Sequence, residues 1–196
     1  VKVDPLVTAE YPIAQAVEAY QRVTSGDADT IGIVLTYPRS GSEQSLNRVW
    51  RHVTETQVVG KDQVGLALVG AGSFARVMHM PNLKSLSSQA SVRAVVSGSG
   101  GSARQAAEEL GASLATTDLG QALALQDLEA VLIATRHHLH AQQCIAAAQA
   151  GKHILVEKPL GLTTKECRDI LAVVEQYGVL CSVNFNRRFS PLAISL

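Results

Sequence analysis

The sequence lacks an excess of charge of either sign. It has 17 Lys and Arg residues and 17 Asp and Glu residues among 196, so its formal net charge is zero. A neutral chain has no net field that attracts nucleic acid or an anionic membrane, and we expect neither as a partner. No apolar run approaches the ~18 residues that cross a bilayer, and the start of the sequence shows no secretory signal pattern.

Cysteine is also scarce, and its three positions are Cys144, Cys167 and Cys181. An odd number at wide spacing suits neither a disulfide framework nor a zinc site, and it favours a reducing, cytoplasmic location. We interpret all three as small buried apolar residues.

The most informative stretch is residues 64–75, VGLALVGAGSFA. Its apolar start suits a strand buried on both faces, and the spacing that follows is G-x-G-x-x-A. The first glycine permits a tight turn, the second lets the backbone approach a pyrophosphate, and the alanine lets the next helix pack closely and aim its N–H groups at the phosphates. The alternative is a plain strand–turn–helix, because the motif alone is weak. The predicted cofactor contacts are Gly70, Gly72, Ser73, Phe74 and Ala75.

Strands and helices alternate after these glycines. Further strands are predicted at 91–97, 112–116, 130–135, 153–157 and 179–183, and helices at 74–86 (with a break near His79), 102–110, 118–125, 141–150 and 163–177. Alternation of this kind indicates βαβ units with right-handed crossovers. The predicted fold class is therefore α/β: a doubly wound parallel sheet of the Rossmann type, with its ligand at the carboxyl ends of the strands.

Residues 1–38 differ in character and form a small N-terminal appendage. A short strand at 1–3, a helix at 11–24 and a strand at 30–37 are expected there. Residues 39–62 are a polar linker in which Leu46, Val49, Trp50 and Val53 are spaced to line one face of a short helix. We expect the appendage to lie outside the main sheet, at its edge or against another copy in a homo-oligomer. The domain boundaries are thus 1–38, 39–62, 63–183 and 184–196, where a truncated substrate domain begins.

Two strand ends face the same crevice as the glycines. One runs into Arg136, and the other runs into Lys158 and Pro159. His137, His138 and His140 follow the first strand without an adjacent carboxylate or cysteine set, so no metal site is predicted.

The strings GLALVGAGSFA, AVLIATRHHLHAQQCIAAAQAGKHILVEKPLGLTTKEC and SVNFNRRFSP resemble the nucleotide-binding half of the family of glucose-fructose oxidoreductase, inositol dehydrogenase and MocA. The resemblance implies that Lys158 stands beside the nicotinamide and assists proton movement at a substrate hydroxyl, with Glu157 orienting Lys158 or the cofactor. It also implies a cis peptide bond between Lys158 and Pro159. Thr135, Arg136 and His140 match a segment of cofactor contacts, although Arg136 stands where the family often has proline.

The pieces PIAQAVEAYQRVTSGDAD and IGIVLTYP resemble the C-terminal tail of medium-chain alcohol dehydrogenases, and NFNRRFSP is similar to a subgroup fused behind such enzymes. These resemblances imply a piece of a bi-domain fusion. An ordinary N-terminal appendage is the alternative.

The cofactor is expected to be NADP or NAD. An NAD enzyme of this fold usually carries an acid at the end of the second strand to bind the ribose, but Ser97, Gly98 and Ser99 stand there. Small residues leave room for a 2′-phosphate, so NADP is slightly favoured. Arg104 is one turn further on, where it either reaches that phosphate or is a solvated helix residue.

The function implied by the resemblance is hydride transfer to or from a carbon of a sugar or cyclitol, the small-molecule substrate. Full family members continue into a domain that supplies the sugar pocket, so this chain alone is expected to be inactive. The alternative is a dinucleotide-binding or sensing module without redox chemistry, which would have no need of Lys158.

Overall fold

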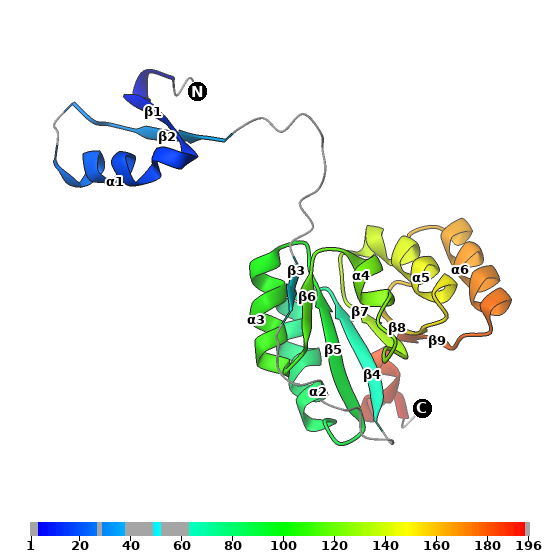
Figure 1. Cartoon of the computed structure of the whole chain (residues 1–196). Helices are drawn as coiled ribbons and strands as arrows, with labels where there is room; N and C mark the ends of the chain where they lie inside the picture. The colour runs from blue at the N-terminus through cyan, green and yellow to red at the C-terminus, as the bar shows by residue number, and fades with distance from the viewer. Residues whose placement is uncertain (1–3, 27–28, 38–48, 52–62, 195–196) are drawn as a thin grey trace. The chain divides into compact units, whose positions relative to one another are not determined.

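The computed structural model describes residues 4–26, 29–37, 49–51 and 63–194. It divides into two compact units, Val1–Ser45 and Leu46–Leu196 (Figure 1).

The first unit is a two-stranded parallel sheet with one helix. Its elements are η1 (Asp4–Leu6), β1 (Ala9–Pro12), η2 (Ile13–Gln15), α1 (Ala16–Thr24) and β2 (Ile33–Thr36). β1 pairs with β2 in parallel, and this pair is separate from the larger sheet. The predicted helix at 11–24 is wrong at its start, because Tyr11 and Pro12 are extended and hydrogen-bonded to β2. The predicted strand at 1–3 lies outside the described residues.

Apolar side chains of this unit are exposed. Val17 is 71% exposed and Tyr20 is 67% exposed on α1. A unit of this size buries little apolar surface by itself. Burial of the exposed apolar side chains of α1 against a partner remains a prediction.

The second unit contains a seven-stranded sheet in the order β3-β6-β5-β4-β7-β8-β9. All neighbouring strands are parallel except β3, which is antiparallel to β6. The order reverses beside β4, which is the switch point of a doubly wound fold. The strands are β3 (Val49–Arg51), β4 (Val64–Val69), β5 (Ala90–Val96), β6 (Leu114–Thr116), β7 (Ala130–Ile133), β8 (His153–Glu157) and β9 (Cys181–Asn184). The helices are η3 (Ala75–His79), α2 (Met80–Ser85), α3 (Gly100–Leu110), α4 (Leu119–Leu123), η4 (His137–Leu139), α5 (His140–Gln149), α6 (Thr164–Tyr177), η5 (Asn186–Phe189) and α7 (Pro191–Ile194).

Helices cover both faces of this sheet (Figure 1). Leu66 and Leu68 of β4 pack with buried residues of α2 and α3. The alternate residues Ala67 and Val69 pack with α4, α5 and α6 on the other face. This two-sided burial explains the continuous apolar run of β4.

The part of the predicted linker that the structure describes is a strand. Val49–Arg51 pairs with β6, with Trp50 opposite Ala115. The expectation of a helix is therefore wrong here, because the free edge of β6 supplies hydrogen-bond partners for an extended chain. Trp50 also packs against the core on the α3 side. Leu46 and Val53 lie outside the described residues.

Local signals fix several helix ends. The helix after the glycines changes near the predicted position: η3 is a π-helical turn, and α2 begins at Met80 with a proline in its first turn. Thr163 and Glu166 form the predicted capping box of α6. Asp118 caps α4 by accepting a hydrogen bond from Gly120 N.

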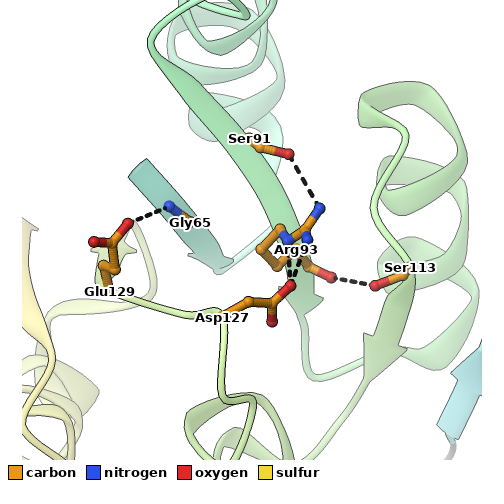
Figure 2. A network of polar contacts seen from close by, with 6 residues as sticks. All are labelled: Gly65, Ser91, Arg93, Ser113, Asp127 and Glu129. Carbon is orange, nitrogen blue, oxygen red and sulfur yellow. Dashed lines mark hydrogen bonds and ion pairs between the residues drawn. The ribbon is translucent and has the colours of Figure 1, made fainter. Parts of the chain in front are cut away.

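A polar network surrounds the amino-terminal halves of β4 and β5 (Figure 2). Arg93 of β5 is 6% exposed and forms an ion pair with Asp127, its Nε donating to Oδ2 at 2.6 Å. Glu129 accepts a hydrogen bond from Gly65 N at 2.9 Å. These contacts join the segment before β7 to β4 and β5.

All three cysteines are free thiols. Cys144 is fully buried, as expected, whereas Cys167 and Cys181 are half-buried. Burial, with a smaller contribution from Cys181, raises the pKa of Cys144 to about 12. No helix among the described residues is long and apolar enough to cross a membrane.

Candidate functional site

The glycine turn follows β4 directly. Gly70 has φ +101°, and a Cβ there would lie 2.7 Å from the carbonyl carbon and oxygen of Ala134. This position therefore requires glycine, because the end of β7 approaches it closely.

The other motif positions have different surroundings. A Cβ on Gly72 would meet nothing within 4 Å, and the residue is exposed. Ser73 and Phe74 are also exposed, whereas Ala75 is fully buried against the sheet. The helix begins at once, with Arg76 N donating to Gly72 O at 3.0 Å. Open space therefore lies over Gly72, beside the first N–H groups of a helix, and this arrangement fits a pyrophosphate.

The lysine loop follows β8. The Lys158–Pro159 peptide bond is cis, which confirms the expectation. The Lys158 side chain is exposed, and within the described ranges it forms no hydrogen bond or ion pair. Its ammonium group is thus available to a ligand.

Glu157, the last residue of β8, is 7% exposed. Its Oε1 accepts hydrogen bonds from His79 Nε2 at 2.8 Å and from Asn184 Nδ2 at 2.7 Å. The ring of His79 also meets Phe74 edge to face, with centroids 5.4 Å apart. One buried carboxylate oxygen therefore joins the glycine-loop helix, β8 and the end of β9.

This role of His79 could not be predicted from the sequence. The sequence indicates only a helix break near His79, and the contact joins residues 78 apart. No local pattern indicates such a contact.

His140 connects the ends of β7 and β8. It is fully buried, and its Nδ1 lies 2.7 Å from Pro159 O while its Nε2 lies 3.2 Å from Thr135 O. Both ring nitrogens are directed to backbone carbonyls, so His140 joins the two loops. The expected contact of His140 with the cofactor stays a prediction.

The other two residues of that segment lie at the open end of β7. Thr135 is half-buried, and its Oγ1 is 2.6 Å from Gln143 Oε1. Arg136 is exposed.

The end of β5 carries small residues, as the sequence indicates. Ser97 is half-buried, its N donates to Thr116 O at 3.1 Å, and Gly98 and Ser99 are exposed. A Cβ on Gly98 would meet nothing within 4 Å.

Arg104 is exposed on α3, as expected for a solvated helix residue, which is one of the two alternatives that the sequence leaves open. Its Nε donates to Glu108 Oε1 at 2.8 Å, and its guanidinium lies 5.4 Å from the ring centroid of Trp50. These two partners hold Arg104 on the outer side of α3.

Histidines do not form a metal centre in the described part of the chain. His137 and His138 are exposed. The described residues contain no group of three or more His, Cys, Asp or Glu side chains arranged to hold a metal ion.

Comparison with known proteins identifies the family. Residues 64–185 match the GFO_IDH_MocA model, which describes an oxidoreductase family with an NAD-binding Rossmann fold. The chain belongs to the Gfo/Idh/MocA oxidoreductase family. The match covers β4 to β9, and so includes both the glycine turn and the lysine loop of this family.

Curated Gfo/Idh/MocA-like relatives are longer than this chain. A 4-carboxy-2-hydroxymuconate-6-semialdehyde dehydrogenase from Sphingobium sp. is 35% identical over 126 residues, which is 64% of this chain and 39% of that protein. A scyllo-inositol 2-dehydrogenase (NAD(+)) from Bacillus subtilis is 36% identical over 129 residues, which is 66% of this chain and 37% of that protein. The chain therefore spans well under half the length of these relatives.

A solved structure supports the same fold. KijD10, a 3-ketoreductase from Actinomadura kijaniata in complex with NADP, matches with a TM-score of 0.63 and 26% identity. The match covers 68% of this chain and 42% of that one.

Proposed function

We propose that the second unit is the cofactor domain of an NAD(P)-dependent oxidoreductase that transfers a hydride to or from a carbon of a sugar or cyclitol. The observation that carries this proposal is the connection between the glycine turn and Lys158, which has no hydrogen-bond or ion-pair partner in the described part of the chain. Gly70 abuts Ala134, and His140 bridges the next residue, Thr135, to Pro159. The phosphate-binding turn and Lys158 therefore belong to one continuous edge of the sheet.

Each part of the cofactor has a counterpart along this edge. The pyrophosphate would lie over Gly72, against the N–H groups of Ser73 and Phe74. The adenosine ribose would lie beside Ser97, Gly98 and Ser99 at the end of β5. The nicotinamide would lie between Thr135 and Arg136 on one side and Lys158 on the other. These residues would form the cofactor site, with Glu157 held rigid beneath it.

The bound cofactor supplies the hydride acceptor or donor. The chain supplies the ammonium group of Lys158, which would donate a hydrogen bond to the substrate oxygen and move a proton at that atom. Glu157 would fix the backbone before Lys158, because two hydrogen bonds anchor its carboxylate. His140 would fix the backbone after it through Pro159 O.

The substrate class is inferred from relatives. One relative is a dehydrogenase of scyllo-inositol, a cyclitol, and a structural neighbour is a 3-ketoreductase. We infer a polyol or sugar for this protein too. Most of the substrate pocket would come from a domain equivalent to the part of the relatives that this chain does not span, so this chain alone would not turn over substrate.

The first unit is proposed to be the terminal part of a medium-chain alcohol dehydrogenase, fused ahead of the Gfo/Idh/MocA domain. Its separate two-stranded parallel sheet supports this proposal, together with the similarity of residues 12–29 and 31–38. The coding sequence upstream of Val1 tests it. A zinc-ligand pattern and a second glycine motif there are expected, and an unrelated upstream sequence would contradict it.

Titration calorimetry with NADH and NADPH tests the cofactor site. We expect this chain to bind at least one of them, and Lys158→Ala to weaken that binding, because the ammonium group would lie against the nicotinamide. Lys165→Ala is a matched control, since it removes the same charge from an exposed position on α6. No binding of either cofactor by the folded protein would refute the proposal.

Turnover separates an oxidoreductase from a binding module. In the full-length protein, scyllo-inositol and related polyols serve as test substrates. Lys158→Ala should reduce kcat by roughly 100-fold or more, the usual contribution of a positioned proton-transfer group. Cofactor binding with unchanged kcat in Lys158→Ala would remove Lys158 from the mechanism.

A further inference from the structure

Arg76 is a cation at the candidate site that the proposed function does not use. It follows Ala75 and belongs to the π-helical turn η3. Its Nε donates to Ala71 O at 3.3 Å, and its Nη2 donates to Ser102 O at 3.4 Å. The guanidinium therefore spans the space between the glycine turn and the first turn of α3.

No ion pair among the residues that the structure describes neutralises the charge of Arg76. Both acceptors are neutral carbonyl oxygens, and both hydrogen bonds are long. Within the described ranges no carboxylate pairs with Arg76. Glu109 is the acid that senses its field, but Glu109 bonds to Lys84 at 2.7 Å, and Lys84 is the main reason that the pKa of Glu109 lies below its usual value. A half-buried guanidinium held by weak contacts can turn to a stronger anionic partner.

The position of Arg76 corresponds to the place that one part of a dinucleotide would take in this fold. In this fold the pyrophosphate lies at the glycine turn, and the adenosine ribose lies at the end of the second strand. Ala71 stands between the two glycines of the turn, and Ser102 stands three residues after Ser99 at the end of β5. A guanidinium that contacts both segments would therefore lie beside the ribose 2′ position of a dinucleotide bound in this way.

Other candidates for this role are weaker. No acid stands at the end of β5 to bind the ribose hydroxyls or repel a phosphate. Arg104 already has Glu108 and the ring of Trp50 as partners. Among the described residues, Arg76 is thus a guanidinium that hydrogen-bonds to both segments and pairs with no carboxylate.

We propose that Arg76 binds the 2′-phosphate of NADP(H) and sets the selectivity of this domain for NADP(H) over NAD(H). The inference rests on the proposed function, because it requires a dinucleotide in this crevice. The planar guanidinium would exchange its two carbonyl contacts for paired hydrogen bonds to phosphate oxygens. Selectivity would then come from an added cation as well as from the missing acid.

Binding measurements on this chain test the inference without turnover. Dissociation constants are measured for NADPH, NADH, adenosine 2′,5′-bisphosphate and AMP at one salt concentration. We expect Arg76→Gln to weaken the binding of NADPH and adenosine 2′,5′-bisphosphate at least tenfold. The dissociation constants of NADH and AMP should change less than threefold. Arg104→Gln is the matched control and should leave all four values unchanged.

A charge-retaining variant covers the case in which Arg76→Gln does not fold. Arg76→Lys keeps the charge but lacks the bidentate hydrogen-bond donor of a guanidinium. It should therefore weaken the binding of NADPH severalfold and leave the binding of NADH unchanged. Equal losses for NADPH and NADH in either variant would assign Arg76 to the pyrophosphate or to the fold and overturn the inference. A tenfold preference of the unmodified protein for NADH would overturn it as well.

The two proposals fail in different ways. If the unmodified protein binds neither cofactor, the proposed function is wrong and this inference falls with it. If it binds both cofactors and only Arg104→Gln loses NADPH selectively, the cofactor site stands and the role given to Arg76 is wrong.

Discussion

Replacing each of the two glycines after β4 with alanine separates folding from cofactor binding. At Gly70 the new Cβ would lie 2.7 Å from Ala134 backbone atoms, at a φ of +101°. A strained backbone of this kind costs about 1–3 kcal/mol, and forced overpacking costs about 1–3 kcal/mol. Gly70→Ala should therefore lower the free energy of unfolding by about 2–6 kcal/mol, a large share of the roughly 5–15 kcal/mol of a typical domain.

Gly72→Ala should instead preserve the stability of the fold and weaken cofactor binding. Nothing lies within 4 Å of its Cβ, and its φ is not positive. The change should leave stability unaltered or raise it by about 0.4–1 kcal/mol, because alanine restricts the unfolded chain. The methyl group would stand where the pyrophosphate approaches, so NADH and NADPH should bind at least tenfold more weakly, a loss of about 1.4 kcal/mol.

Urea unfolding followed by circular dichroism measures the first effect, and titration calorimetry measures the second. An unchanged unfolding midpoint for Gly70→Ala would refute the argument from close approach. Unchanged cofactor affinity for Gly72→Ala would refute the placement of the pyrophosphate.

Two further predictions concern the core. Asp127→Ala removes the carboxylate that pairs with the buried Arg93 and should lower the free energy of unfolding by about 2 kcal/mol. Lys165→Ala breaks only an exposed pair with Asp169 and should change the free energy of unfolding little. Equal losses of stability for the two variants in urea unfolding would contradict this prediction. Cys144 should resist iodoacetamide in the folded protein, because burial raises its pKa to about 12 and the reactive thiolate is scarce. The unfolded thiol ionises near pH ~8.5, so this residue's contribution to stability should fall as pH rises above that value. Rapid labelling of Cys144 near neutral pH, detected by mass spectrometry, would show that this burial is wrong.

The parts of the fold that could be predicted are those that the local sequence determines. The strand predicted at 153–157 is β8, His153–Glu157, because its apolar run is bounded by a glycine before it and a proline after it. The start of α1 and the strand at Val49–Arg51 could not be predicted. Each depends on hydrogen bonds to a strand that comes later in the chain, β2 in one case and β6 in the other.

The candidate site also contains some residues whose roles the local sequence indicates and others whose roles depend on distant contacts. Gly70 and Lys158 lie in motifs whose spacing already indicates a role, and the cis bond before Pro159 followed from resemblance. The contact of His79 with Glu157 depends on strand order, which brings η3 beside β8. The inward direction of the His140 ring was also hidden, because sequence places a residue near a strand end without giving its orientation.

The short strand β3 also determines where a shortened version of this domain can begin. Its three residues occupy an edge of the seven-stranded sheet and hydrogen-bond to β6. A shortened protein that begins at Gln63 would keep the whole matched region but leave the backbone groups of β6 unpaired along that edge. An uncovered strand of this kind recruits strands from other molecules, so such a protein should self-associate and precipitate, whereas one that retains Val49–Arg51 should stay dispersed.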